Sequence, residues 1–248
     1  MSATARIRAE FGAAWHSFVR RRTAVFFTFF FPVILIVIFG ALVRTDPTGG
    51  GLFTEPPEYY LAGYLAVVVM FTPLSRVGST VARHREGTRF EKLATTPLSR
   101  TEWLLAHTLV NVVLVGAASA VLLVVLLLIT DAQFVPSPLL VPFVALGTAL
   151  FCGFGAILGR VADSQDGVIA AANTVALPML FLAETFVPPA LLPEWMGPLI
   201  DLLPLTYFAR GVRAVTSTGD PWLADLAVLA GLAVAFLLVG AYAIPRTD

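Results

Sequence analysis

The sequence WLLAHTLVNVVLVGAASAVLLVVLLLIT, residues 103–130, runs for 28 residues without a charged side chain. An α-helix rises about 1.5 Å per residue, so this stretch is long enough to cross the roughly 30 Å hydrocarbon core of a bilayer. The whole chain has the same character, because 58% of its 248 residues are hydrophobic and only 13% are charged. An ordinary soluble domain is about 25% charged. The sequence therefore predicts an all-α integral membrane protein.

Further charge-free intervals predict six transmembrane helices in a single domain that covers residues 1–248. Each interval is close to the roughly 20 apolar residues that a spanning helix needs. The expected spans lie at about 23–43, 59–82, 103–129, 139–159, 167–187 and 223–244. The apolar part of the first interval is longer than that of a signal peptide, so we expect it to be retained as a span.

Lysine and arginine are distributed unequally between the two sides of this layout. Thirteen of the 16 basic residues lie in 1–22, 76–102, 160–166 and 246–248. The opposite side keeps only Arg44, Arg210 and Arg213. Because cytoplasmic loops are enriched in Lys and Arg, we expect a multi-pass protein of the cell (plasma) membrane with both termini in the cytoplasm.

An amphipathic helix is expected within residues 1–22, ahead of the first span. Its apolar stripe consists of Ile7, Phe11, Ala14, Trp15 and Phe18. Such a helix lies in the membrane interface, where its arginines meet anionic headgroups of membrane lipids. It is either a plain topology anchor or a lever that joins the first span to a cytoplasmic partner.

Residues 83–100 connect the second and third spans and contain a second, short amphipathic helix. Phe90, Leu93 and Ala94 share one face, and Pro97 ends the helix. A helix this short is unstable alone in water, so its apolar face needs the bilayer or a protein. A solvated charge run that only sets the topology is the alternative.

Residues 188–213, before the last span, combine apolar character with five prolines. Proline removes a backbone hydrogen bond from an ordinary helix and clashes with its preceding turn. We therefore predict short, broken, re-entrant helices that enter the membrane from the outer side, where protein covers their irregular backbone. An amphipathic loop that rests on the outer surface is the alternative.

The chain lacks the side chains on which most enzyme sites depend. Its one lysine, Lys92, follows Glu91, so the phosphate-binding pattern G-x-x-x-x-G-K-[ST] is absent. One cysteine and three scattered histidines do not indicate a metal site. The basic run before Lys92 is too short for a nucleic-acid surface. We expect no enzyme activity, no cofactor or metal bound by this chain and no nucleic-acid partner.

Two segments carry a family resemblance. The first runs from Arg85-Glu86-Gly87-Thr88 to Thr96-Pro97-Leu98-Ser99-Arg100, and the second lies within 178–213 and contains Leu192-Pro193-Glu194-Trp195 and Leu203-Pro204-Leu205-Thr206-Tyr207. In order, spacing and placement they resemble the permease subunits of type-2 ATP-binding-cassette (ABC) exporters, in the drug-resistance and polysaccharide- or lipid-export branch. One departure is that Phe181-Leu182 is followed by Ala183-Glu184, where the family usually has a Ser-Gly pair.

The resemblance implies a transport subunit that moves a hydrophobic or amphipathic cargo (drug-like, lipid or glycan) outward. Two permeases, as a homodimer or paired with a sister permease, would work with cytoplasmic ABC ATPase subunits that bind ATP and Mg²⁺. The helix in 83–100 would be the coupling helix, with contacts to the ATPase from Glu86, Thr88, Phe90, Glu91 and Leu93. The substrate pathway would lie along the first, second and fifth spans, at Phe27, Phe30, Met70, Thr72, Asn173, Thr174, Phe181 and Glu184.

Two other functions compete with this interpretation. An ATP-independent channel or carrier would need a titratable path through the membrane, and Glu184, at the outer end of the fifth span, is the nearest candidate. A non-transporting membrane scaffold would use its basic inner loops to recruit a partner.

Overall fold

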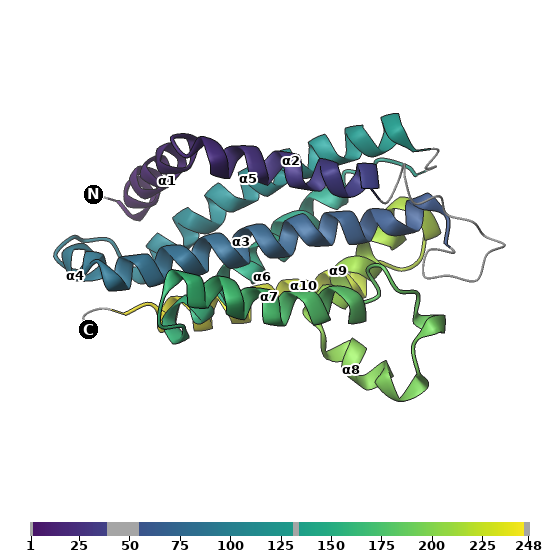
Figure 1. Ribbon diagram of the computed structural model, residues 1–248. Helices are drawn as coiled ribbons and strands as arrows, with labels where there is room; N and C mark the ends of the chain where they lie inside the picture. Colours follow the sequence, from purple (N-terminus) through teal and green to yellow (C-terminus); the bar gives the residue numbers. More distant parts are fainter. Residues whose placement is uncertain (1, 39–54, 131–133, 246–248) are drawn as a thin grey trace.

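The computed structural model describes residues 2–38, 55–130 and 134–245, and within these ranges the chain is helical, without a β-strand. The long helices lie side by side in an elongated bundle (Figure 1). In chain order the elements are α1 (Ala3–Val19), α2 (Arg22–Ile36), η2 (Pro57–Tyr60), α3 (Leu61–Glu86), α4 (Arg89–Ala94), α5 (Arg100–Ile129), α6 (Leu140–Val161), α7 (Gln165–Leu182), η3 (Pro189–Leu191), η4 (Glu194–Met196), α8 (Gly197–Leu202), α9 (Pro204–Arg213), the π-helical turn η5 (Ala214–Thr218) and α10 (Leu223–Ala243). The expected all-α class is confirmed.

Among the described residues, five helical stretches are long and apolar enough to cross a membrane. They are Pro57–Glu86, Arg100–Ile129, Leu140–Val161, Gln165–Leu182 and Leu223–Ala243. The first expected span, 23–43, begins within α2, but residues 39–43 lie outside the described ranges. The layout with six spans therefore stays a prediction.

The helix at the fifth expected span, 167–187, is shorter than the sequence indicated, because α7 ends at Leu182. Glu184 adopts the left-handed backbone conformation, with φ of 57°, which a right-handed helix does not accommodate. Residues 183–187 form turns and bends that lead to the proline-rich segment. The early end of α7 brings Glu184 to a sharp corner of the chain.

The helices α3 and α6 form the most extensively packed pair, and α10 also packs closely on α6. Glycines let the backbones of α3 and α6 approach each other. A Cβ atom on Gly159 would lie 2.4 Å from the carbonyl oxygen of Gly78, and one on Gly155 would lie 2.6 Å from that of Leu74. Gly155 and Gly159 have the small-xxx-small spacing typical of contacts between membrane helices.

The other helices are covered less well by this chain. In the most apolar windows of α3 and α6, 67% of the residues are buried, whereas the corresponding shares for α7 and α10 are 28% and 22%. The exposed apolar faces of α7 and α10 need lipid or another subunit as their environment.

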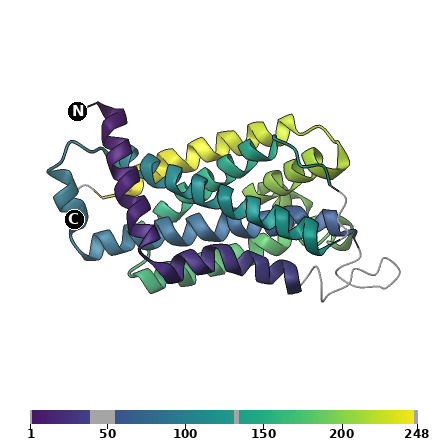
Figure 2. The same ribbon diagram turned by 90° about the horizontal axis from the view of Figure 1, so that it is seen from above.

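The two ends of the bundle differ in their elements. Both chain termini and α4 lie at one end (Figure 1), and α1 crosses the bundle there (Figure 2). We call this the terminal end. The short elements η3, η4 and α8 lie toward the opposite end, which we call the α8 end.

Candidate functional site

At the terminal end, Glu102 links the start of α5 to α1. Ser99 and Glu102 form a reciprocal capping box: Glu102 N donates to Ser99 Oγ at 3.2 Å, and Ser99 N donates to Glu102 Oε2 at 2.9 Å. The same carboxylate accepts from Arg6 Nε at 3.0 Å and from Arg6 Nη2 at 2.5 Å. The hydrogen bond with Glu102 raises the pKa of Arg6 above its ordinary value. One carboxylate thus begins α5 and holds α1 against it.

A second polar contact joins the same two helices one turn further along α1. Glu10 Oε1 lies 3.2 Å from His107 Nε2. Beyond it, Ala14 and Phe18 are buried in a small apolar cluster with α5 side chains. The amphipathic helix therefore rests on the protein along its length, with two polar contacts at i and i+4 spacing.

The short helix α4 is anchored to the bundle by one aromatic side chain. Phe90 is only 6% exposed, and its ring centroid lies 5.5 Å from that of Trp103 and 5.3 Å from that of His84. Thr88, just before α4, has a left-handed φ of 52°, so the chain turns sharply between α3 and α4. Phe90 therefore faces its own chain.

The other residues of the expected coupling helix lie nearer the surface. Leu93 is half-buried, and Glu86, Thr88 and Glu91 are exposed. Glu86 Oε1 accepts a hydrogen bond from the backbone of Gln165 at 3.3 Å, which joins the end of α3 to the start of α7. An apolar groove of about 440 Å³ lies beside α4, and its lining includes Phe90, Leu93, Ala94, Leu98, Trp103 and Ile244.

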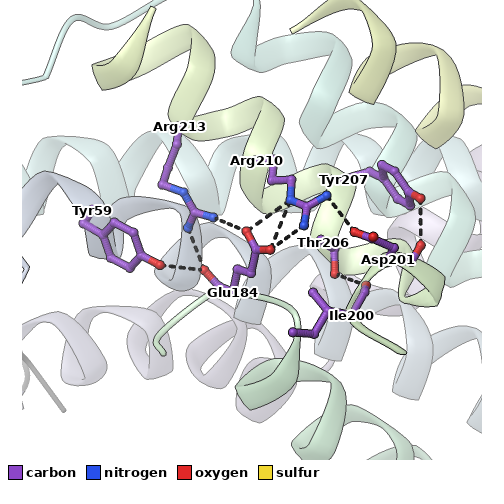
Figure 3. Close-up of polar contacts among 8 residues, drawn as sticks. All are labelled: Tyr59, Glu184, Ile200, Asp201, Thr206, Tyr207, Arg210 and Arg213. Carbon is purple, nitrogen blue, oxygen red and sulfur yellow. Dashed lines mark hydrogen bonds and ion pairs between the residues drawn. The ribbon is translucent and has the colours of Figure 1, made fainter. Parts of the chain in front are cut away.

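At the α8 end, Glu184 is the centre of a buried ionic cluster (Figure 3). Arg210 of α9 donates to its carboxylate from Nε at 3.1 and 3.2 Å and from Nη2 at 2.5 Å. Arg213, one turn later, donates to the Glu184 carbonyl oxygen at 2.6 Å and lies 3.4 Å from its carboxylate. Tyr59 donates to the same carbonyl at 3.3 Å, and Arg210 also reaches Asp201 at 2.9 Å.

This cluster joins four parts of the chain: η2 just before α3, the corner after α7, α8 and α9. The side chain of Glu184 is 6% exposed, that of Arg213 9% and that of Arg210 37%. The hydrogen bond with Glu184 raises the pKa of Arg210, whereas desolvation lowers the pKa of Arg213. Removing charges from water is costly unless they are paired and hydrogen-bonded, and here the carboxylate has two guanidinium partners.

The residues expected along a substrate pathway differ in burial within the described ranges. Phe27, Phe30 and Phe181 are 58%, 45% and 53% exposed. Asn173 and Thr174 are also exposed, whereas Thr72 is half-buried and Met70 lies in the core. The exposed members lie on α2 and α7, which both pack against α3. Their pathway role stays a prediction.

The partners of Glu184 could not be predicted from the sequence. Glu184 was expected at the outer end of the fifth span, but Arg210 and Arg213 lie 26 and 29 residues further along the chain. A usable signal was present, because these two arginines are rare basic residues on the expected outer side. An acid and two bases in an apolar region are expected to pair.

The fold and these contacts define a multi-pass α-helical membrane protein with a tethered α1 and α4 at one end. The family model described as ABC-2 type transporter matches residues 6–216. The chain belongs to this family, as a permease subunit of an ABC transporter. It is 30% identical over 218 residues to the daunorubicin resistance ABC transporter permease protein DrrB1 of Streptomyces coeruleorubidus, and the match covers 83% of this chain and 74% of that protein. The predicted family is confirmed.

Proposed function

We propose that this chain is the membrane-spanning subunit of an ATP-driven exporter, and that a separate cytoplasmic ABC ATPase docks at the terminal end of the bundle, beside α4. The observation that carries this proposal is the attachment of α4: buried Phe90 fixes it to α3 and α5, while Leu93 borders the apolar groove beside it. A helix held this firmly passes a displacement on to the spanning helices. Membership of the ABC-2 family supports the ATPase as the partner.

The ATPase supplies the ATP and Mg²⁺ site, and this chain supplies the path through the membrane. Coupling requires that the ATPase contact two conformations of the permease with different free energies. We assign that contact to Leu93, Glu91, Glu86 and Thr88, with Phe90 as the internal anchor of α4. Both termini lie at this end of the bundle, which supports a cytoplasmic location for them.

We further propose that the cargo is a hydrophobic or amphipathic drug-like molecule that moves between two permease subunits, as a homodimer or with a sister permease. The relative's name, which refers to daunorubicin resistance, supports a drug-like cargo over a lipid or glycan. The exposed aromatic rings of Phe27, Phe30 and Phe181 support a lining on α2 and α7.

The test is co-purification of the ATPase together with ATP-dependent uptake of a fluorescent anthracycline into inverted membrane vesicles. Leu93→Asp is expected to abolish both, because a carboxylate in the apolar groove opposes docking. Leu191→Asp is the matched control, since Leu191 is exposed at the α8 end; it should retain the ATPase. Uptake that needs no ATP, or an ATPase still bound to Leu93→Asp, would contradict the proposal.

A further inference from the structure

A polar cavity of about 240 Å³ lies inside the terminal end of the bundle. Contributions to its wall come from α1, α2 and the corner before it, α3, α4, α5 and the start of α7. At about 30 Å³ per water molecule, it has room for a small polyatomic ion. The cavity is separate from the apolar groove beside α4 and from the ionic cluster around Glu184.

Four arginines line this cavity, and they come from separate parts of the chain. Arg76 and Arg83 lie on α3 and are partly buried, whereas Arg21 and Arg89 are exposed at the rim. Glu10 is the one carboxylate in the lining, and it already contacts His107 at 3.2 Å. Within the part of the chain that the structure describes, none of the four arginines has a carboxylate partner within salt-bridge distance.

Arg76 is the clearest sign that this cavity is built for a ligand. It lies ten residues before the end of α3, about 15 Å along the helix axis. Its guanidinium group sits over the ring of Phe18 at 4.3 Å, yet its Nη1 is buried without a hydrogen-bond partner among the described residues. Leaving such a group unpaired is costly, and Arg76 lines the cavity, so an acceptor bound there would satisfy it once the side chain turns toward the cavity.

Other arginines of this chain are used differently. Arg85 donates to the carbonyl oxygens of Gly159, Arg160 and Ala162 at the end of α6. Arg6, as described above, is paired with Glu102. Arg6 and Arg85 therefore have acceptors within the protein, whereas Nη1 of Arg76 has none among the described residues.

We propose that this cavity binds a phosphate group, with Arg76 and Arg83 as its main ligands and Arg21 and Arg89 at its entrance. Guanidinium groups match the oxygens of phosphate with paired hydrogen bonds. The hydroxyls of Ser75, Ser79 and Thr80 also line the cavity and supply further donors. The phosphate belongs either to a phospholipid headgroup of the adjacent leaflet or to a soluble phosphate, and the experiment separates these two sources.

The experiment measures the Tm of the full chain, purified in detergent and stripped of lipid, against ligand concentration. The three probes are dioctanoyl phosphatidylglycerol, dioctanoylglycerol, which lacks the phosphate, and inorganic phosphate. A phosphate ligand is expected to raise Tm in a saturable manner, and dioctanoylglycerol is not. A response to phosphatidylglycerol alone identifies a lipid headgroup, and an equal response to inorganic phosphate identifies a soluble source.

Two variants with matched changes of charge locate the ligand. The double variant Arg76→Gln/Arg83→Gln is expected to weaken the apparent Kd at least about tenfold, because hydrogen bonds between charged groups are lost. The double variant Arg8→Gln/Arg22→Gln removes the same charge from exposed residues outside the cavity, and its Kd should stay within about twofold of the parent. Equal weakening by both would overturn the proposal.

Glu10→Gln gives a test that does not depend on removing an arginine. It takes the one carboxylate out of the cavity lining, so phosphate affinity should rise severalfold. Loss of stability cannot imitate a gain in affinity, which keeps the test decisive if the double arginine variant fails to fold. Unchanged or weaker binding by Glu10→Gln, or no Tm rise with either phosphate probe, would overturn the proposal.

Discussion

The two ends of the bundle handle buried charge in opposite ways. At the α8 end, Glu184 and the guanidinium groups of Arg210 and Arg213 satisfy one another within the chain. At the terminal end, Arg6 has Glu102, but the cavity behind α1 holds Arg76, whose buried Nη1 has no acceptor among the residues that the structure describes. A compensated cluster fixes the backbone that carries it, whereas an uncompensated one favours an anion from outside.

This difference indicates that ion pairs within the chain hold the segments of the α8 end together. The corner after α7, α8 and α9 meet in one ionic cluster (Figure 3), so separating them would break the hydrogen bonds and ion pairs that join them. The terminal end is held by α1 and α4, each through a few side chains.

The largest effect is expected from Glu184→Ala, which leaves buried Arg213 without its carboxylate. Breaking a buried ion pair by removing one partner costs about 3–5 kcal/mol, so Tm measured in detergent should fall steeply. Glu194→Ala, at an exposed carboxylate of the same segment, is the control and should change stability by less than about 0.5 kcal/mol. Similar Tm values for the two variants would mean that the α8 end is not held by this cluster.

A smaller loss of stability is expected when either arginine of the cluster is replaced. Arg213→Gln should destabilise the protein more than Arg210→Gln, because the Arg213 side chain is 9% exposed and that of Arg210 is 37% exposed. Arg213 also lies 4.6 Å from the centre of the Tyr59 ring. We expect the two free energies of unfolding to differ by about 1 kcal/mol, measured by thermal or denaturant unfolding. The reverse order would mean that the contacts of Arg210 with Glu184 and Asp201 contribute more to stability than the more deeply buried Arg213.

The smallest effect is expected at the terminal end, from Arg6→Gln. It removes a charged partner of Glu102 but leaves the Ser99–Glu102 capping box in place, so α5 should keep its start. Hydrogen exchange should accelerate in α1 alone, since local opening exposes only that helix. Arg8→Gln, at an exposed arginine of the same helix, should leave exchange unchanged. Faster exchange across α5 as well would show that α1 and α5 open as one unit.

Charge-free length and composition were sufficient to predict the helical class, because a bilayer accepts few alternatives to the helix. The fifth span was expected at about 167–187, whereas the helix α7 ends at Leu182. Apolar residues continue past that point, and hydropathy does not report backbone conformation. The left-handed Glu184 decides the end of the helix, and its carboxylate and carbonyl contact residues far along the chain.

The contacts at the terminal end could be predicted from the sequence only in part, because they too depend on packing between distant segments. Phe90, Leu93 and Ala94 share one face of a short helix, and their spacing cannot say which of them face their own chain. The structure buries Phe90 against Trp103 and leaves Leu93 at a groove. Similarly, Arg21, Arg76, Arg83 and Arg89 were counted as topology signals, and only the packing of α1 over α3 and α5 brings them to one cavity.

The glycine contacts between α3 and α6 set a limit on how this protein can change shape. A methyl group on Gly159 would lie 2.4 Å from the carbonyl oxygen of Gly78, so the backbones of α3 and α6 are in contact there. If one helix slid along the other, larger side chains would have to take the place of these glycines. The helices α3 and α6 are therefore expected to move as one rigid pair. Any change of shape that displaces α3 is therefore expected to carry α6 with it, so the movement falls on the less closely packed contacts of this pair with the other helices.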